Sequence, residues 1–193
     1  GVLDRRIADG TADFTQGPAM TREQALLAIE TGMALVRDAR EAGFSLLATG
    51  EMGIGNTTTS SAVAAVLLGE PVERMTGRGA GLSDAGLGRK LDAIRRGIAR
   101  NRPNAADALD VLGKLGGLDI AGLCGVFLGG ARYRVPIVMD GFISGVAALC
   151  AVRLCPKAEA AIFASHASSE PAARRVMEAL GKRPLITAGM HLG

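Results

Sequence analysis

The amino-acid sequence predicts an α/β fold: a Rossmann-like parallel sheet covered by helices on both faces, within a single domain spanning residues 1–193. Two observations predict this. Three short runs, residues 44–48, 135–139 and 160–164, are apolar throughout, as strands buried on both faces of a parallel sheet are. Segments with helical spacing separate these runs, and each run ends in glycine or polar residues.

The first predicted helix begins after Thr21, because Thr21 and Gln24 fit the capping box S/T-x-x-E/Q. Its apolar residues recur at helical spacing as far as Gly43. The first apolar run follows, and then a helix over residues 57–68. That helix stops at Gly69, as a helix with a glycine C-terminus does.

The middle of the chain reads as helices joined by glycine-rich turns. Residues 76–83 form a glycine-rich connection into a helix that begins near Ser83. Pro103 starts another helix, and residues 119–131 read as an Ala/Gly-rich helix packed closely on a neighbour. The remaining predicted elements are a helix over 142–154, a helix that follows Glu170 and runs to Gly181, and an extended segment over 184–187.

Residues 49–59, TGEMGIGNTTT, carry the strongest functional signal. They follow an apolar run and precede a helix, which is the arrangement of an anion site. Unpaired backbone N–H groups and the positive end of the helix dipole would face a ligand above Gly53 and Gly55. The segment fits neither the P-loop nor G-x-G-x-x-G, and a tight turn without ligand explains the glycines equally well. Glu51 favours a ligand. A carboxylate would repel phosphate, so we expect it to face sugar hydroxyls or a ring nitrogen.

Composition excludes several classes of function. Hydrophobic residues make up 48% and charged residues 21%, which is a globular composition. The net charge of +3 is scattered among acids, and five Phe, one Tyr and no Trp leave little to stack on bases, so nucleic-acid binding is disfavoured.

Three cysteines without a CxxC pair read as buried thiols in a reducing compartment, and two histidines exclude a His-rich metal centre. No window reaches the roughly 18 apolar residues of a membrane span, and the N-terminus lacks a signal-peptide pattern. The sequence therefore predicts a cytoplasmic protein.

Polar residues follow every predicted strand, and in open α/β sheets ligands bind beyond the carboxyl ends of the strands. Asp140, residues 165–168 and the tail 189–193 would gather there with the 49–59 segment. Each has a structural alternative. Asp140 and Ser168 are also good helix caps, and His166 could be a hydrogen-bonded core histidine.

Five segments stand in order along the chain: GTADFTQGPAM (10–20), GEMGIGNTTTSSA (50–62), TGRGAGLSDAGLGRK (76–90), VPIVMDGFISGVAAL (135–149) and SHASSEP (165–171). Together they resemble the nicotinate-nucleotide:5,6-dimethylbenzimidazole phosphoribosyltransferase family, and the resemblance covers essentially the whole chain. It implies a pentosyltransferase of the lower-ligand branch of cobalamin synthesis, which moves the phosphoribosyl group of nicotinate mononucleotide to the benzimidazole. It also implies two small-molecule substrates, no cofactor, no metal and a homodimer.

The resemblance further implies which residues hold the substrates. Phosphate would lie against backbone N–H groups of residues 53–57 and 77–81, with Lys90 as the countercharge, and Asp140 and Ser168 would contact the ribose or its neighbourhood. The implied substrate-binding set is Gly53, Ile54, Gly55, Asn56, Thr57, Gly79, Lys90, Asp140, Ser168 and Leu192.

In this family the catalytic base is a glutamate immediately after the segment that matches 189–193, and the sequence stops at Gly193. The expectation is therefore a large-domain piece, without the N-terminal part and the C-terminal catalytic extension, with Glu51 as the secondary candidate base and weak activity.

Two alternatives remain. One is a nucleotide-binding module without catalysis. The other is a dinucleotide-dependent oxidoreductase, with Glu70 or Glu73 on the ribose, which the glycine pattern disfavours.

Overall fold

The computed structural model describes residues 2–79, 81–168 and 170–187. Most of that chain is helical. The helices are α1 (Arg22–Glu41), α2 (Asn56–Leu68), α3 (Asp84–Asn101), α4 (Ala108–Leu115), α5 (Leu118–Tyr133), α6 (Phe142–Leu154) and α7 (Pro171–Ala179), with two 3₁₀ turns, η1 (Val72–Arg74) and η2 (Pro156–Ala161). The strands are β1 (Leu47–Ala48), β2 (Ile137–Met139) and β3 (Ile162–Ala164).

The strands form one parallel sheet in the order β1-β2-β3, with Leu47 opposite Ile137 and Ile137 opposite Ile162. Beyond β3 the chain returns beside the sheet, where Ile186 pairs with His166 in an isolated parallel bridge. The predicted α/β class with a parallel sheet is confirmed. The extended segment over 184–187 is seen only as this single bridge.

The strands are shorter than the sequence predicts. The first apolar run lies mostly outside the sheet, because β1 covers only Leu47 and Ala48, and Phe44 and Leu46 before it are 60% and 57% exposed. Pro156 starts the 3₁₀ turn η2, which occupies the beginning of the third run. The fourth helix also begins later than Pro103, at Ala108, because Asp107 accepts the N–H groups of Leu109 and Asp110 as its N-cap.

The two faces of the sheet differ. Ile137, Met139, Ile162 and Ala164 are buried on the face toward the helices. On the opposite face Val138 is half-buried and Phe163 is 45% exposed. In the described chain the second face is therefore covered less completely than the first.

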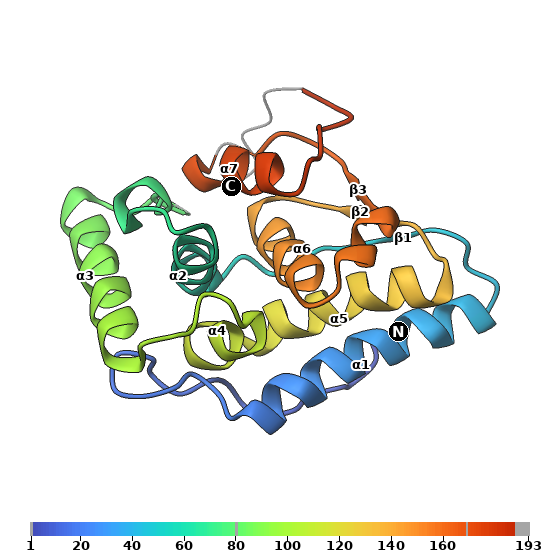
Figure 1. The fold of residues 1–193 in the computed structure, drawn as a ribbon, viewed down its shortest axis with the longest axis horizontal. Coiled ribbons are helices and arrows are strands. Elements are labelled where there is room, and N and C mark those ends of the chain that lie inside the picture. Colours follow the sequence, from blue (N-terminus) through green and yellow to red (C-terminus); the bar gives the residue numbers. More distant parts are fainter. Residues whose placement is uncertain (1, 80, 169, 188–193) are drawn as a thin grey trace.

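Helices α1 and α5 lie side by side along the molecule (Figure 1). Glycines allow this close approach: a Cβ on Gly125 would lie 2.0 Å from the carbonyl oxygen of Ile29, and one on Gly32 equally close to that of Gly122. The predicted close packing of an Ala/Gly-rich helix is confirmed. At the other side of α5, the α6 helix is buried over most of its length.

The predicted helix ends are largely confirmed. The Thr21 hydroxyl accepts the N–H of Gln24 at 3.1 Å, and the Gln24 side chain accepts the N–H of Thr21 at 2.9 Å. Helix α2 begins one residue earlier than predicted and ends at Leu68, followed by the C-cap Gly69, whose φ is 63°.

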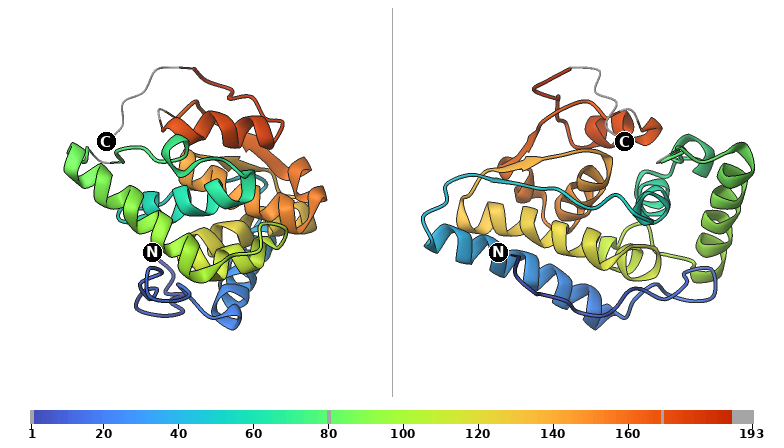
Figure 2. Two further views of the ribbon diagram at one scale, coloured as in Figure 1. Left: turned by 60° about the vertical axis from the view of Figure 1, so that its left-hand side comes forward. Right: turned by 180° about the vertical axis from the view of Figure 1, so that it is seen from behind.

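Helix α3 stands at one end of the molecule and the strands lie toward the other, as the view from behind also shows (Figure 2). None of the helices in the described ranges combines the length and apolarity needed to cross a membrane.

Candidate functional site

The glycine loop joins β1 to α2 in a backbone shape that glycine favours. Gly53 and Gly55 have φ of 74° and 78°, where a side chain would add strain. Gly55 is the N-cap residue of α2, and no side chain of the described chain caps this helix. The first N–H groups of α2 are consequently open to a ligand, and the helix dipole adds positive potential there.

Lys90 brings a buried cation from α3 to the same place. The residue is only 6% exposed, and Nζ donates hydrogen bonds to the Thr57 hydroxyl and the Gly77 carbonyl oxygen, each at 3.0 Å. An ammonium has three N–H donors, so these contacts leave one for a ligand. Burial lowers the pKa of Lys90, and the charge of Glu170 opposes that shift.

The connection over residues 76–83 is held against α2. Gly79 has a φ of 56°, and a Cβ there would lie 3.0 Å from the Thr57 hydroxyl oxygen. A Cβ on Gly77 would run into the Glu170 carboxylate. The structure therefore brings together the glycine loop, Gly79 and Lys90, as the family resemblance implies, and adds Glu170 beside them.

Glu51 lies in the loop itself and has two hydrogen-bond partners there. Its carboxylate accepts hydrogen bonds from the backbone N–H of Gly53 and from Asn56 Nδ2, the second at 2.6 Å. The same Nδ2 donates to Asp119 Oδ2 at 2.9 Å. Asn56 thus joins two carboxylates, one in the loop and one in the first turn of α5.

Two clefts flank this arrangement. One of about 510 Å³ lies between α1, α5 and the loop, and one of about 430 Å³ lies between the loop and the segment around Gly10. Ile54, Asn56 and Asp119 line both. Ile54 is 82% exposed, so an apolar side chain stands open beside the polar groups of both clefts.

Asp140 and Ser168 form a neighbouring cluster at the ends of β2 and β3. Asp140 Oδ1 lies 3.9 Å from His166 Nδ1, and the Ser165 hydroxyl lies 2.9 Å from the same nitrogen. A Ser-His-Asp triad would use both ring nitrogens, so this cluster is not one. The backbone N–H of Asp140 donates to the Thr49 hydroxyl at 3.1 Å, which links it to the end of β1.

The capping alternatives for these two residues are wrong. Helix α6 has Gly141 as its N-cap and no side-chain cap from the described chain, so Asp140 does not have that role. Helix α7 has Glu170 at its N-cap, and the Ser168 hydroxyl accepts the N–H of Glu170 itself, at 3.3 Å. The tail 189–193, with the predicted site residue Leu192, lies outside the described residues.

Among the described residues, no group of three or more His, Cys, Asp or Glu side chains could hold a metal ion. The predicted buried thiols are confirmed for two cysteines. Burial raises the pKa of the Cys124 thiol, and that of Cys150 to about 12, so both stay protonated and unreactive at neutral pH.

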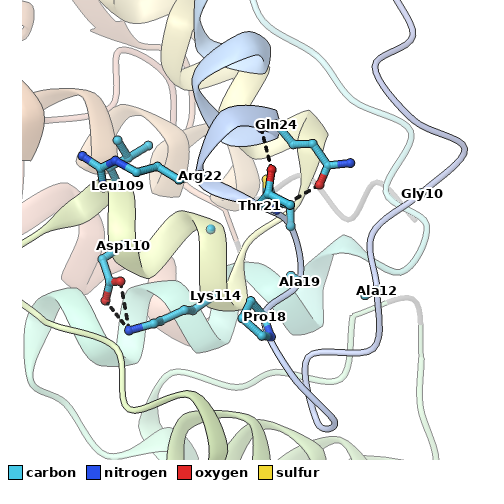
Figure 3. A pocket seen from close by; sticks show the side chains of 12 residues that line it. Gly10, Ala12, Pro18, Ala19, Thr21, Arg22, Gln24, Leu109, Asp110 and Lys114 are labelled. Carbon is cyan, nitrogen blue, oxygen red and sulfur yellow. Dashed lines mark hydrogen bonds and ion pairs between the residues drawn. The ribbon is translucent and has the colours of Figure 1, made fainter.

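A further cleft of about 500 Å³ lies between the start of α1, α4 and the 10–20 segment (Figure 3). Its polar side chains bond one another: Lys114 contacts Asp110 at 2.9 Å, and Thr21 and Gln24 form the cap of α1. None of the predicted site residues lines it. We therefore place the candidate site at the glycine loop.

The sequence interpretation missed Asp119 and Glu170. A carboxylate in the first turn of a helix is ordinary in sequence, and its meeting with Asn56 depends on how α5 packs against α2. For Glu170 a weak signal existed, because it stands in the SHASSEP segment after a predicted strand.

Comparison with known proteins gives one family. The profile of a phosphoribosyltransferase family matches residues 2–193. The chain is 52% identical over 193 residues to the nicotinate-nucleotide–dimethylbenzimidazole phosphoribosyltransferase of Acetivibrio thermocellus, and 52% identical over 192 residues to that of Roseiflexus sp.. Each alignment covers 100% of this chain and 55% or 54% of the relative, so the chain spans about half the length of these relatives.

Solved structures agree. The crystal structure of CobT from Thermus thermophilus matches all of this chain and 58% of its own, with a TM-score of 0.94 at 42% identity. A structure of nicotinate-nucleotide-dimethylbenzimidazole phosphoribosyltransferase from the same organism matches with a TM-score of 0.91 at 41% identity and 57% coverage. From its sequence and its fold alike, the chain belongs to this phosphoribosyltransferase family.

Proposed function

We propose that this chain carries the nucleotide-binding part of an enzyme of cobalamin lower-ligand synthesis. The enzyme transfers the phosphoribosyl group of nicotinate mononucleotide to 5,6-dimethylbenzimidazole, which gives α-ribazole 5′-phosphate and nicotinate. The names of the relatives support these substrates. Both substrates are small molecules.

One observation carries the proposal: the buried Lys90 ammonium next to the uncapped N-terminus of α2. Placing a cation in a buried position costs free energy unless an anion or several acceptors compensate it. The phosphate of a mononucleotide supplies such an anion. It would accept N–H groups from residues 54–57 and 77–79 as well as the remaining N–H of Lys90, since the N–H of Gly53 is donated to Glu51.

The proposed reaction balances without a metal or cofactor. A benzimidazole nitrogen attacks C1′ of the ribose from the face opposite nicotinate, so the new bond is α where the broken bond was β. The pyridinium ring leaves with the bonding electron pair and becomes neutral. The proton on the second benzimidazole nitrogen passes to a carboxylate acting as general base.

Glu51 opens onto the cleft beside Ile54, as Asp119 does. We keep it as the secondary candidate base, after the glutamate that the family has beyond the position of Gly193. In the proposed complex Asp140 and Ser168 contact the ribose or its surroundings. The predicted binding role of Leu192 falls outside the described residues. The homodimer and the cytoplasmic location stay predictions.

Calorimetry of the 193-residue chain with nicotinate mononucleotide tests the proposal, and an assay for α-ribazole 5′-phosphate with both substrates follows. We expect binding that Gly55→Val weakens, since a side chain there would block the approach of phosphate to the backbone. Failure of the mononucleotide to bind would contradict the proposal. Binding without turnover, even in a longer protein containing the expected glutamate, would favour a non-catalytic nucleotide-binding module.

A further inference from the structure

Asp119 is the one acidic partner from outside the loop that reaches the Glu51–Asn56 pair in the described chain. It stands in the first turn of α5, far from Glu51 in sequence. Asn56 Nδ2 carries two hydrogens, and the two carboxylates take one each, at 2.6 and 2.9 Å. The side-chain amide thus links an element of the core to the glycine loop.

The two carboxylates fix the orientation of the Asn56 amide. Asn56 is 8% exposed, and its Oδ1 atom is buried without a hydrogen-bond partner among the described residues. The oxygen therefore does not hold the side chain in place. Removing Asp119 would take away the acceptor of one of the two N–H groups of this amide and leave Glu51 as its only side-chain partner among the described residues.

The loop itself gives Glu51 little support. Besides Asn56, its carboxylate contacts only the N–H of Gly53 among the described residues, and that contact lies within the same glycine loop. By contrast α5 packs along α1 and is rigidly placed by glycine contacts. An anionic side chain in the first turn of α5 is also favoured by the helix dipole. Asp119 is therefore the anchored end of the chain of contacts.

We propose that Asp119 is a positioning residue, which holds Asn56 and through it the Glu51 carboxylate in the direction that faces the bound heterocycle. The link to the heterocycle rests on the proposed function. The positioning itself is a property of the unliganded chain. Both carboxylates line the cleft of about 510 Å³, so together they would also favour a ring that carries positive charge or an N–H donor.

Two variants separate the roles of Asp119. Asp119→Asn keeps an oxygen that accepts the Asn56 N–H, whereas Asp119→Ala removes it. Asp110→Ala is the matched control, because Asp110 also stands in the first turn of a helix but contacts Lys114 and Asn104 instead. All three are compared with the unaltered chain by ¹H–¹⁵N spectra, which report the Asn56 side-chain amide and the Gly53 backbone N–H.

We expect Asp119→Ala to displace both resonances, and Asp119→Asn and Asp110→Ala to leave them in place.

In calorimetry Asp119→Ala should weaken mononucleotide binding roughly 10- to 100-fold, the range for one lost hydrogen bond to a charged group. Asp119→Asn should keep most of the affinity. Unmoved resonances in Asp119→Ala, or equal displacement in the control, would overturn the proposal. If Asp119→Ala does not fold, displaced resonances in Asp119→Asn overturn it and unmoved ones support it. Lack of mononucleotide binding by the unaltered chain would count against the proposed function alone, since the spectra still decide the positioning.

Discussion

The ammonium of Lys90 lies 3.0 Å from the Thr57 hydroxyl, which ties α3 to the first turn of α2. Two glycine segments meet at this contact, because Gly79 packs on Thr57 and Gly77 accepts the second hydrogen bond of Lys90. A change at any of these positions should therefore alter anion binding more than it alters the fold.

Replacing Lys90 should separate phosphate recognition from recognition of the nucleoside. Lys90→Met keeps the aliphatic volume and removes the charge. The binding free energy for nicotinate mononucleotide should therefore become less favourable by about 1.5–3 kcal/mol, the range for a charge-assisted contact. Affinity for nicotinate riboside, which lacks the phosphate, should hardly change. Calorimetry with both ligands checks this, and Arg89→Met is the control, since Arg89 is adjacent in sequence but exposed. Equal losses for both ligands would exclude the phosphate role.

The same substitution should change how stability depends on pH. Burial lowers the pKa of Lys90 from its ordinary value of 10.5, so the ammonium destabilises the folded chain while both states are protonated. Between the lowered pKa and 10.5 the unfolded chain binds more protons, and folding stability therefore rises with pH. At pH 7 the unaltered chain should be less stable than Lys90→Met. The difference in unfolding free energy between the two proteins should shrink as the pH approaches 10.5. Urea unfolding at several pH values measures the difference.

Two buried thiols act in the opposite direction in that experiment. Their raised pKa values mean that the unfolded chain loses these protons first, so stability falls with rising pH. Both proteins share this effect, and it cancels when their stabilities are subtracted. A constant difference between the two unfolding curves from pH 7 to 10.5 would contradict the burial effect on Lys90.

Glu170 should compete with the ligand phosphate. Its charge stabilises the Lys90 ammonium in the unliganded chain, and its carboxylate lies against Gly77. Glu170→Gln removes a negative charge from beside the proposed phosphate site, so the affinity for mononucleotide should rise several-fold at low salt and less at high salt. Glu178→Gln, an exposed acid of α7, is the control. A weaker affinity in Glu170→Gln would instead make Glu170 a ligand contact.

Local patterns sufficed to predict most helices and the glycine loop. The capping box at Thr21, the stop at Gly69 and the glycines before α2 depend only on residues close to them in the sequence. Such features can therefore be predicted without knowing how distant elements pack. Lys90 was found through the resemblance of residues 76–90 to a family and not through periodicity. Its burial against Thr57 could not be deduced from an amphipathic pattern, which places lysine at the surface.

Features that depend on packing between distant elements could not be predicted. The contact from Asp119 to Asn56 exists only because the first turns of α5 and α2 meet. In the sequence, each of these residues alone looks like an ordinary polar residue at the start of a helix. Likewise Phe163 belongs to an apolar run but is 45% exposed, because periodicity records the character of a side chain and not what covers it.

Gly79 should be sensitive even to one methyl group. Its φ of 56° disfavours other residues, and a Cβ would lie 3.0 Å from the Thr57 hydroxyl oxygen that accepts from Lys90. Gly79→Ala should therefore weaken mononucleotide binding while the melting temperature falls only slightly. Gly88→Ala is the control, because a Cβ at this exposed position of α3 meets nothing within 4 Å. Unchanged binding in Gly79→Ala would show that the Thr57 hydroxyl tolerates displacement.

The glycine contact between α1 and α5 should matter for stability and for the site together. A Cβ on Gly125 would lie 2.0 Å from the Ile29 carbonyl oxygen, and backbone atoms cannot yield as a flexible side chain can. Gly125→Ala should therefore force the helices apart and cost about 1–3 kcal/mol of unfolding free energy, whereas Gly88→Ala should gain up to about 1 kcal/mol from helix propensity. Since α5 also carries Asp119, a shift of this helix should displace the Asn56 side-chain amide resonance. Urea unfolding and ¹H–¹⁵N spectra of the two variants measure both effects, and a Gly125→Ala protein as stable as the unaltered chain would show that the two helices can separate without loss.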